Sequence, residues 1–262
     1  MPRRPITFIG STSIHLLSQL GRFSKFCWDT LVSIKKSGLS LPLLFQQLEF
    51  VGVQSFWIIV LAAIMVGAVF GIQFGNIFKL FGAESLIGAA AAFALSKELA
   101  PVIGAFLVTG RAGSAMAAEI ANMRVNEQID AMQTMSVNPL AYLCAPRIIA
   151  SMLMLPLLSS IFVLVGVLSS YFIGCALYEI DSSVFIDKIR WISQPNHILQ
   201  GLQKSIFFGA IFSSIACFQG YYATGGAKGV GKATTDAVVL ALVCILVSDF
   251  FISYVQMTAL FP

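Results

Sequence analysis

The chain has 262 residues, of which 58% are hydrophobic and only 11% are charged. Soluble domains carry about 25% charged residues, so this composition argues against a soluble enzyme and excludes a disordered or coiled-coil protein. The net charge of +4 is too small to indicate binding to nucleic acid. We therefore expect an all-α integral membrane protein that forms one domain over residues 1–262.

The first predicted element is an amphipathic helix over residues 13–36. A helix with an apolar stripe and basic residues on its polar side is typical of the membrane surface, and a soluble helix that faces a core is the alternative. The apolar stripe consists of Leu16, Leu20, Phe23, Cys27, Leu31 and Ile34, and the charged residues that fall mostly elsewhere are Arg22, Lys25, Asp29 and Lys36.

Five apolar segments follow, and a membrane crossing needs about 20 such residues. We predict spans over residues 53–74, 86–108, 148–178, 205–222 and 237–261. Pro156 lies inside the third segment, so we expect a kink or a break there. The second segment is rich in alanine and glycine, which allow close helix packing in lipid, so we expect it inside a bundle or at a subunit contact.

The basic residues orient these spans, because they are enriched in cytoplasmic segments. With the N-terminus in the cytoplasm, eleven lysines and arginines fall on the cytoplasmic side and four on the opposite side, and Lys97 lies within a span. Lys204 is one of the four, at the edge of the fourth span. An odd number of spans places the two termini on opposite sides.

One short motif resembles a phosphate-binding loop but lacks a required residue. The segment Gly226–Ala233 has the GxxxxGK spacing, but Ala233 replaces the Ser or Thr that holds magnesium, and the segment links two spans. We interpret it as a cytoplasmic loop, with Thr234 or Thr235 capping the last span. Because nucleophile and metal-ligand patterns are also missing, we expect no enzyme activity, no metal and no cofactor.

Three charged residues lie within predicted spans, namely Lys97, Glu98 and Asp249. A charge at the bilayer centre costs at least ~2.5–3.5 kcal/mol on insertion scales, so such groups pair with one another or line a polar cavity. Two interpretations remain open. The three residues form an internal ion pair, or they line a cavity that meets a charged headgroup or an ion.

Charged residues are densest in the cytoplasmic segment of residues 111–147. The hydrophobic positions change phase near Arg124, which predicts two short helices or one bent helix. The apolar face of these helices has no partner in the chain that is large enough to cover it, so we infer a cytoplasmic partner protein. The polar residues that this partner would meet are Glu119, Arg124, Glu127, Gln128 and Asp130.

Several motifs together resemble the MlaE/YrbE family of membrane permeases. The most specific is the run TGRAGSA from Thr109 to Ala115, and the likeness extends from about Gln46 to the C-terminus. Further matching segments are Lys97–Pro101, Ala118–Ile120, Met123–Arg124, Glu127–Met132, Asn138–Pro139, Pro146–Arg147, Gly220–Tyr221, Ala233–Thr235 and Asp249–Phe250.

The resemblance implies the transmembrane subunit of an ABC transporter that moves phospholipid between the inner and outer membranes of bacteria and maintains outer-membrane lipid asymmetry. Such permeases are homodimers in the inner membrane, with a separate cytoplasmic ATPase, a periplasmic protein of the MCE type and, in many cases, a small STAS-domain protein. The C-terminus would then be periplasmic. The segment of residues 111–147 would be the coupling element that the ATPase binds.

The resemblance also makes Lys97, Glu98 and Asp249 the predicted contacts of the transported phospholipid. Many relatives have Arg where this chain has Lys97, and lysine keeps the charge but loses the bidentate grip on phosphate. The alternative function is an ion- or proton-coupled secondary transporter that uses the same three residues. The odd number of spans and the lack of an internal repeat argue against that alternative.

Overall fold

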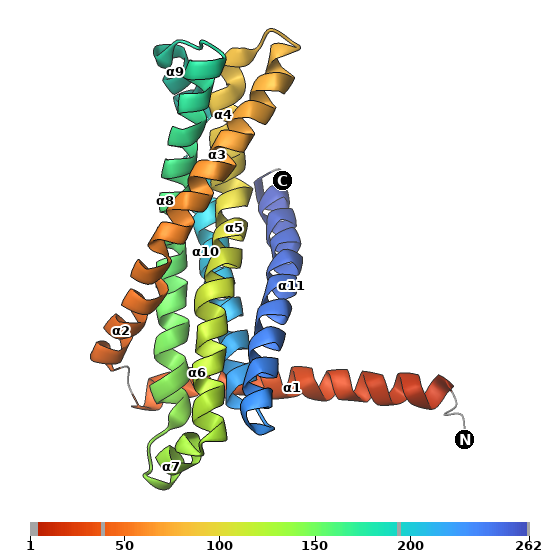
Figure 1. Ribbon diagram of the computed structural model, residues 1–262. Coiled ribbons are helices and arrows are strands. Elements are labelled where there is room, and N and C mark those ends of the chain that lie inside the picture. The colour runs from red at the N-terminus through yellow and green to blue at the C-terminus, as the bar shows by residue number, and fades with distance from the viewer. Residues whose placement is uncertain (1–4, 38–39, 193–194, 261–262) are drawn as a thin grey trace.

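A computed structural model describes residues 5–37, 40–192 and 195–260, and α-helices make up nearly all of them (Figure 1). The helices are α1 (Pro5–Ser37), α2 (Leu41–Val51), α3 (Phe56–Lys79), α4 (Ile87–Ala94), α5 (Ala100–Val108), α6 (Ser114–Val125), α7 (Gln128–Thr134), α8 (Ala145–Leu177), α9 (Ser182–Ile192), α10 (Pro195–Tyr221) and α11 (Gly226–Leu260). Two π-helical turns, η3 (Leu95–Leu99) and η4 (Thr109–Gly113), join α4, α5 and α6 without a loop, and a third, η5 (Leu140–Cys144), leads directly into α8.

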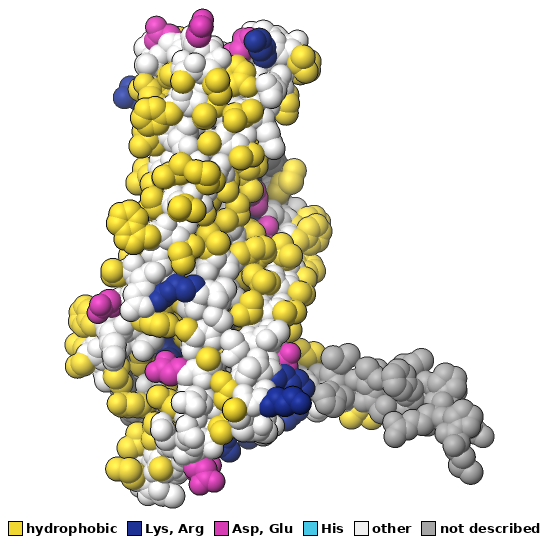
Figure 2. Space-filling view, viewed as in Figure 1, with side chains coloured by type: hydrophobic (Ala, Val, Ile, Leu, Met, Phe, Trp, Pro, Cys, Tyr) yellow, Lys and Arg dark blue, Asp and Glu magenta, His cyan; other side chains and the backbone are white. Residues whose placement is uncertain are grey.

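The predicted all-α membrane fold with five spans is confirmed. Within the described residues, five helical segments are long and apolar enough to cross a membrane, namely Leu41–Lys79, Glu84–Val125, Leu140–Leu177, Asn196–Tyr221 and Gly226–Thr258. Figure 2 shows the same pattern on one face, where hydrophobic side chains dominate the middle of the bundle and charged side chains gather toward its two ends. We call these ends the α7 end and the α9 end.

The α10 span is the most buried of the five, and the α11 span is the most exposed. The Ala-rich second span also lies inside the bundle, as predicted, because Ala89, Ala91 and Ala105 have no exposed surface. Small residues also allow α3 and α8 to pack closely, since a Cβ added at Gly67 would lie 2.1 Å from the carbonyl oxygen of Gly166.

Several helices extend beyond the predicted spans. The second span continues through η4 and α6 to Val125, so the first part of the predicted 111–147 loop is a helical extension of that span. Of the kink or break expected at Pro156, the break is absent, because α8 is continuous through this residue. Transmembrane helices tolerate proline where neighbouring helices and hydroxyl side chains compensate for the lost hydrogen bond.

The segment of residues 226–233 is also helical, so its interpretation as a loop was wrong. Positive φ angles at Gly225 (96°) and Gly226 (66°) complete the turn after α10, and α11 begins at once. Thr234 and Thr235 do not cap the helix, because their hydroxyls donate to the carbonyls four residues earlier, at 2.8 and 3.1 Å. Gly226, the first glycine of the phosphate-loop pattern, therefore forms part of the turn between α10 and α11.

Helix α1 lies across the α7 end of the bundle and extends away from it to one side (Figure 1). Its buried face consists of Phe26, Thr30 and Ser33, whereas Leu20 and Leu31 of the predicted apolar stripe are more than 60% exposed. Leu16 and Lys36, also part of the predicted helix, are not among the residues whose side chains the structure describes. An exposed apolar stripe on a helix with this placement suits a membrane surface.

Helix α9 covers the opposite end of the bundle through one aromatic anchor. Phe185 is fully buried and lies so close to α4 that a Cβ added at Gly88 would meet its ring at 2.6 Å. The helix is capped by Asp181, whose carboxylate accepts hydrogen bonds from the backbone and hydroxyl of Ser183 at 2.7 and 2.6 Å.

The Asp181 cap makes α9 sensitive to acid. The Ser183 hydroxyl and backbone hydrogen bonds lower the pKa of Asp181 from its ordinary value. A carboxyl with a lowered folded-state pKa contributes stability above its unfolded pKa, near 3.9, and loses it as the pH falls through the folded value. We therefore expect amide hydrogen exchange in residues 182–185, after correction for its intrinsic pH dependence, to accelerate below about pH 4. In Asp181→Ala the exchange should be fast at every pH, and equal exchange in both proteins would contradict the cap.

Candidate functional site

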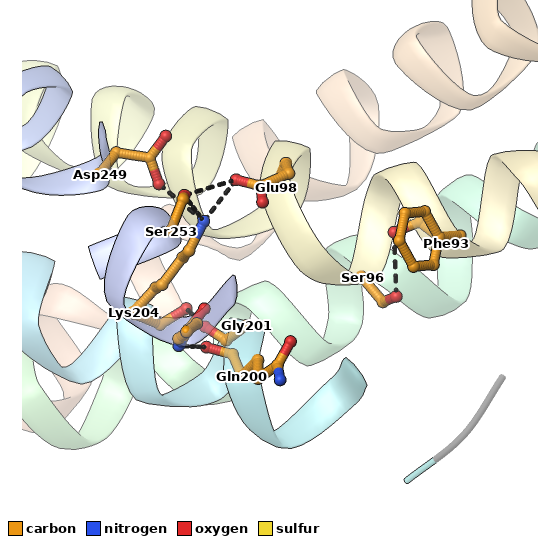
Figure 3. A network of polar contacts seen from close by, with 10 residues as sticks. Phe93, Ser96, Glu98, Gln200, Gly201, Lys204, Asp249 and Ser253 are labelled. Carbon is orange, nitrogen blue, oxygen red and sulfur yellow. Dashed lines mark hydrogen bonds and ion pairs between the residues drawn. The ribbon is translucent and has the colours of Figure 1, made fainter. Parts of the chain in front are cut away.

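A fully buried lysine lies inside the membrane-spanning bundle. Lys204 has no exposed surface, and it lies on α10 nine residues after the first residue of that helix, Pro195. The expected place of this lysine at the outer edge of a span was wrong, because α10 begins well before residue 205. Figure 3 shows its side chain pointing toward α11 and toward η3 of the second span.

Two carboxylates and a hydroxyl from other spans surround the Lys204 ammonium. Its Nζ atom donates to Glu98 of η3 and, at 2.7 Å, to Ser253 of α11, and it lies 2.9 Å from the carboxylate of Asp249 on α11. The hydroxyl of Ser253 also donates to Glu98 at 3.3 Å. This cluster of Glu98, Lys204, Asp249 and Ser253, the Lys204 cluster, has one cation and two carboxylates, so its net charge is −1 with all groups ionised.

The carboxylates of Glu98 and Asp249 are only partly buried. The side chain of Glu98 is 41% exposed and that of Asp249 is 22% exposed, whereas the Lys204 side chain is completely covered. The cluster therefore holds its cation inside and presents negative charge outward, at mid-span. Such a site can bind a cationic group or take up a proton.

Local backbone geometry explains how Glu98 reaches this position. Pro101 has no N–H to donate to the carbonyl of Lys97, and the helix widens into the π-turn η3 just before it. Helix α10 approaches this turn closely because Gly201 has no side chain, since a Cβ there would lie 2.0 Å from the carbonyl oxygen of Ser96. Lys204 follows Gly201 by three residues and so faces the same turn.

Lys97 does not belong to the cluster. Its ammonium lies 5.5 Å from the ring centre of Phe93, and this ring also contacts the imidazole of His197 at a centroid distance of 5.1 Å. Among the described residues Lys97 has no carboxylate partner. The structure thus brings Glu98 and Asp249 together, as the ion-pair interpretation expected, but it supplies Lys204 as the cation and leaves Lys97 apart.

The five predicted coupling residues fall into three groups at the α7 end. Glu119 pairs with the buried Arg147 at 2.8 Å, and Arg124 pairs with Asp130 at 2.5 Å across the turn between α6 and α7. Glu127 and Gln128 are exposed at that turn. Glu127 itself has φ +57°, which makes the sharp turn between the two helices.

The change of phase near Arg124 corresponds to the turn between α6, which continues the second span, and the short helix α7, but the apolar face of both helices is covered within the chain. Ile120 and Ile129 are fully buried in a cluster that includes Phe26 of α1 and Phe218 of α10. Gln133 of α7 also donates to the hydroxyl of Tyr221 at the end of α10, at 3.2 Å. The expectation that this face has no partner within the chain was wrong, because α1 and α10 cover it.

Comparisons with known proteins agree with this architecture. The family model "Permease MlaE" matches residues 44–255. A probable ABC transporter permease protein of Rickettsia prowazekii is 38% identical over 245 residues, covering 94% of this chain and 95% of that protein. A probable ABC transporter permease protein of Synechocystis is 42% identical over 211 residues, covering 80% of each chain.

A plant relative has a sequence identity close to that of the Synechocystis protein. The protein TRIGALACTOSYLDIACYLGLYCEROL 1, chloroplastic, of Arabidopsis thaliana is 43% identical over 208 residues, which is 79% of this chain and 59% of that protein. The family match covers the spans, the Lys204 cluster and helices α6 and α7 together. The chain therefore belongs to the MlaE permease family.

Proposed function

We propose that this chain is the permease subunit of an ATP-driven transporter that moves phospholipid between the inner and outer membranes of a bacterium and so maintains outer-membrane lipid asymmetry. The Lys204 cluster is the observation that carries the proposal, because it places partly exposed carboxylates at mid-span. The plant relative named for a galactolipid supports a lipid as substrate.

The charges near the cluster suit a zwitterionic headgroup. Glu98 and Asp249 present negative charge to an amine, and Lys97, which has no carboxylate partner among the described residues, presents an ammonium to a phosphate. These three residues are the proposed substrate contacts. Lys204 is the internal counter-ion that makes two carboxylates tolerable in the bilayer.

A second copy of the chain would enclose such a site. Helix α11 presents a continuous exposed apolar face, and Phe250 and Phe251, directly after Asp249, are 67% and 61% exposed. A homodimer that uses this face would cover the exposed side of the Lys204 cluster and form a cavity between two chains. Lipid alone would cover the same face in a monomer.

Coupling to ATP hydrolysis would occur at the α7 end, through a separate cytoplasmic ATPase. The exposed residues Glu127 and Gln128 offer polar contacts there, and the pairs Glu119–Arg147 and Arg124–Asp130 hold α6 and α7 in place. The Gln133–Tyr221 hydrogen bond links α7 to α10, the helix that carries Lys204. Movement of α7 would therefore be transmitted along α10 to the cluster.

The resemblance supports the remaining parts of the proposal. The α7 end would face the cytoplasm with the N-terminus, and the C-terminus would be periplasmic. With Lys204 removed from the opposite side, the bias becomes eleven basic residues against three. A periplasmic MCE-type protein would receive or deliver lipid at the α9 end, and a STAS-domain protein would bind the ATPase.

Reconstitution tests this function directly. The complex is purified from its own membranes, its proteins and lipids are identified by mass spectrometry, and it is placed in vesicles that contain a fluorescent phospholipid. We expect an ATPase to co-purify and lipid to reach the MCE-type protein only when ATP is hydrolysed. Activity without ATP that follows an ion or pH gradient would instead support a secondary transporter that uses Lys97, Glu98 and Asp249.

Charge reversal at Glu127 tests the coupling surface. We expect Glu127→Lys to reduce co-purification of the ATPase by at least about tenfold, because a like-charge contact in an interface costs several kcal/mol. Glu127→Asn removes the charge but tolerates the positive φ, so it should bind with a smaller loss. The thermal unfolding of the isolated permease should not change in either variant. ATPase recovery equal to that of the parent in Glu127→Lys would exclude this turn from the contact.

A further inference from the structure

A hollow lies where α1 crosses the α7 end of the bundle, and its lining shares no residue with the Lys204 cluster. It has a volume of about 400 Å³ and lies between α1, the last turns of α10 and the first half of α11. This volume is of the size that small-molecule pockets occupy. Nothing in the proposed transport cycle uses it.

The hollow is polar at one end and apolar at the other. On α11, Asp236, Leu240 and Cys244 line it at intervals of four residues, so they lie on successive turns of one helix face, with Asp236 nearest the α7 end. On the other walls, Gln219 lies two residues before the end of α10, and Gln19 comes from α1. The lining therefore changes from polar to apolar from the α7 end toward the middle of the membrane.

Asp236 is the one charged residue in this lining. The structure gives its carboxylate no hydrogen bond or ion pair within the described residues, although Lys232 lies one turn away on the same helix. Two aromatic rings of the same lining, those of Phe23 and Phe218, meet edge to face at a centroid distance of 5.3 Å. A hollow that contains one exposed carboxylate and two aromatic rings favours a cationic group.

We propose that this hollow, the α1 pocket, binds an amine-bearing zwitterionic phospholipid of the phosphatidylethanolamine class. The amine contacts Asp236 at the level of α1, and an acyl chain follows Leu240 and Cys244 toward the bilayer centre. The lipid fills the space between α1 and the bundle and fixes α1 against it. This site is separate from the proposed transport site and does not depend on it.

Lipid titration of the full-length protein tests the α1 pocket. The purified, delipidated chain is titrated in detergent with phosphatidylethanolamine or with phosphatidylglycerol of the same acyl composition, and the bound lipids are counted by native mass spectrometry. We expect Asp236→Asn to weaken binding of one phosphatidylethanolamine molecule by about three- to fivefold, as for an exposed ion pair, and to leave phosphatidylglycerol unchanged. Leu240→Trp, which fills the pocket, should remove that molecule whichever headgroup it carries.

Glu49→Gln is the matched control, because Glu49 is an exposed carboxylate on α2 that does not line the pocket. Equal binding of phosphatidylethanolamine to Asp236→Asn and the parent would overturn the proposal. So would a change of oligomeric state in Leu240→Trp with lipid binding intact, since the pocket would then receive a second copy of the chain. ATP-dependent lipid transfer should be unchanged in Asp236→Asn, whereas failure of the proposed transport function would appear in the parent itself.

Discussion

Replacing Lys204 by methionine is expected to destabilise the protein by up to about 3–5 kcal/mol, the usual cost of removing one partner from a fully buried ion pair. The variant would leave the carboxylates of Glu98 and Asp249 close together without their cation. Thermal unfolding of the purified chain in detergent measures the effect. Lys97→Met in η3, next to Glu98, is the control. Its stability should fall by at most about 1 kcal/mol, because Lys97 makes only a partly exposed cation–π contact.

Neutralising the whole Lys204 cluster separates its structural role from its role in transport. The triple variant Lys204→Met, Glu98→Gln, Asp249→Asn has no unpaired buried charge, so most of the lost stability should return. If the carboxylates bind substrate, this stable variant will not transport lipid. Full transport by the triple variant would show that the ion cluster only holds three spans together, and unfolding of Lys204→Met at the parental temperature would contradict the cluster itself.

The fold was predictable because its main signal is simple. Five long apolar runs with few or no charges indicate five spans, and the alanines of the second run indicate a helix inside the bundle, where Ala89 and Ala105 are indeed fully buried. Helix ends were less predictable. Hydropathy shows where the apolar run ends. The helix of the second span nevertheless continues past Arg111 as α6, because hydrogen bonding and packing against α10 and α11 maintain it.

The Lys204 cluster was only half predictable for the same reason. Glu98 and Asp249 interrupt apolar runs and are conspicuous, whereas Lys204 stands just before a predicted span and resembles an interfacial lysine. One signal was available. Lys97 and Glu98 are adjacent and point about 100° apart on a helix, so the cation that meets Glu98 had to come from another span. Lys204, which directly precedes the predicted fourth span, was a candidate for that cation.

The surface at the α7 end shows a different limit of sequence analysis. The apolar positions of residues 111–147 correctly indicated two helices with one face to bury. Their partner could not be identified, because Phe26 of α1 lies about a hundred residues away in sequence from Ile129, which it helps to cover. Long-range packing of this kind leaves no periodic signal in either segment.

Gly201 gives the second large expected effect. A Cβ at this position would lie 2.0 Å from the backbone carbonyl of Ser96, and a backbone atom cannot rotate away as a side chain does. We expect Gly201→Ala to push α10 from η3, to cost about 1–3 kcal/mol as overpacking does, and to separate Lys204 from Glu98. Thermal unfolding and lipid transfer in vesicles measure the two consequences.

Gly231→Ala is the matched control because Gly231 lies within helix α11 with no atom within 4 Å of an added Cβ. Alanine is a better helix former than glycine, so this variant should be neutral or up to about 1 kcal/mol more stable. The opposite signs of the two glycine substitutions are the decisive comparison. If Gly201→Ala is also neutral, α10 does not approach η3 as closely as the structure places it, and Lys204 would need another reason to be buried. If it is destabilised and inactive, the missing side chain at Gly201 is what allows a lysine and two carboxylates from three spans to meet in the middle of the membrane.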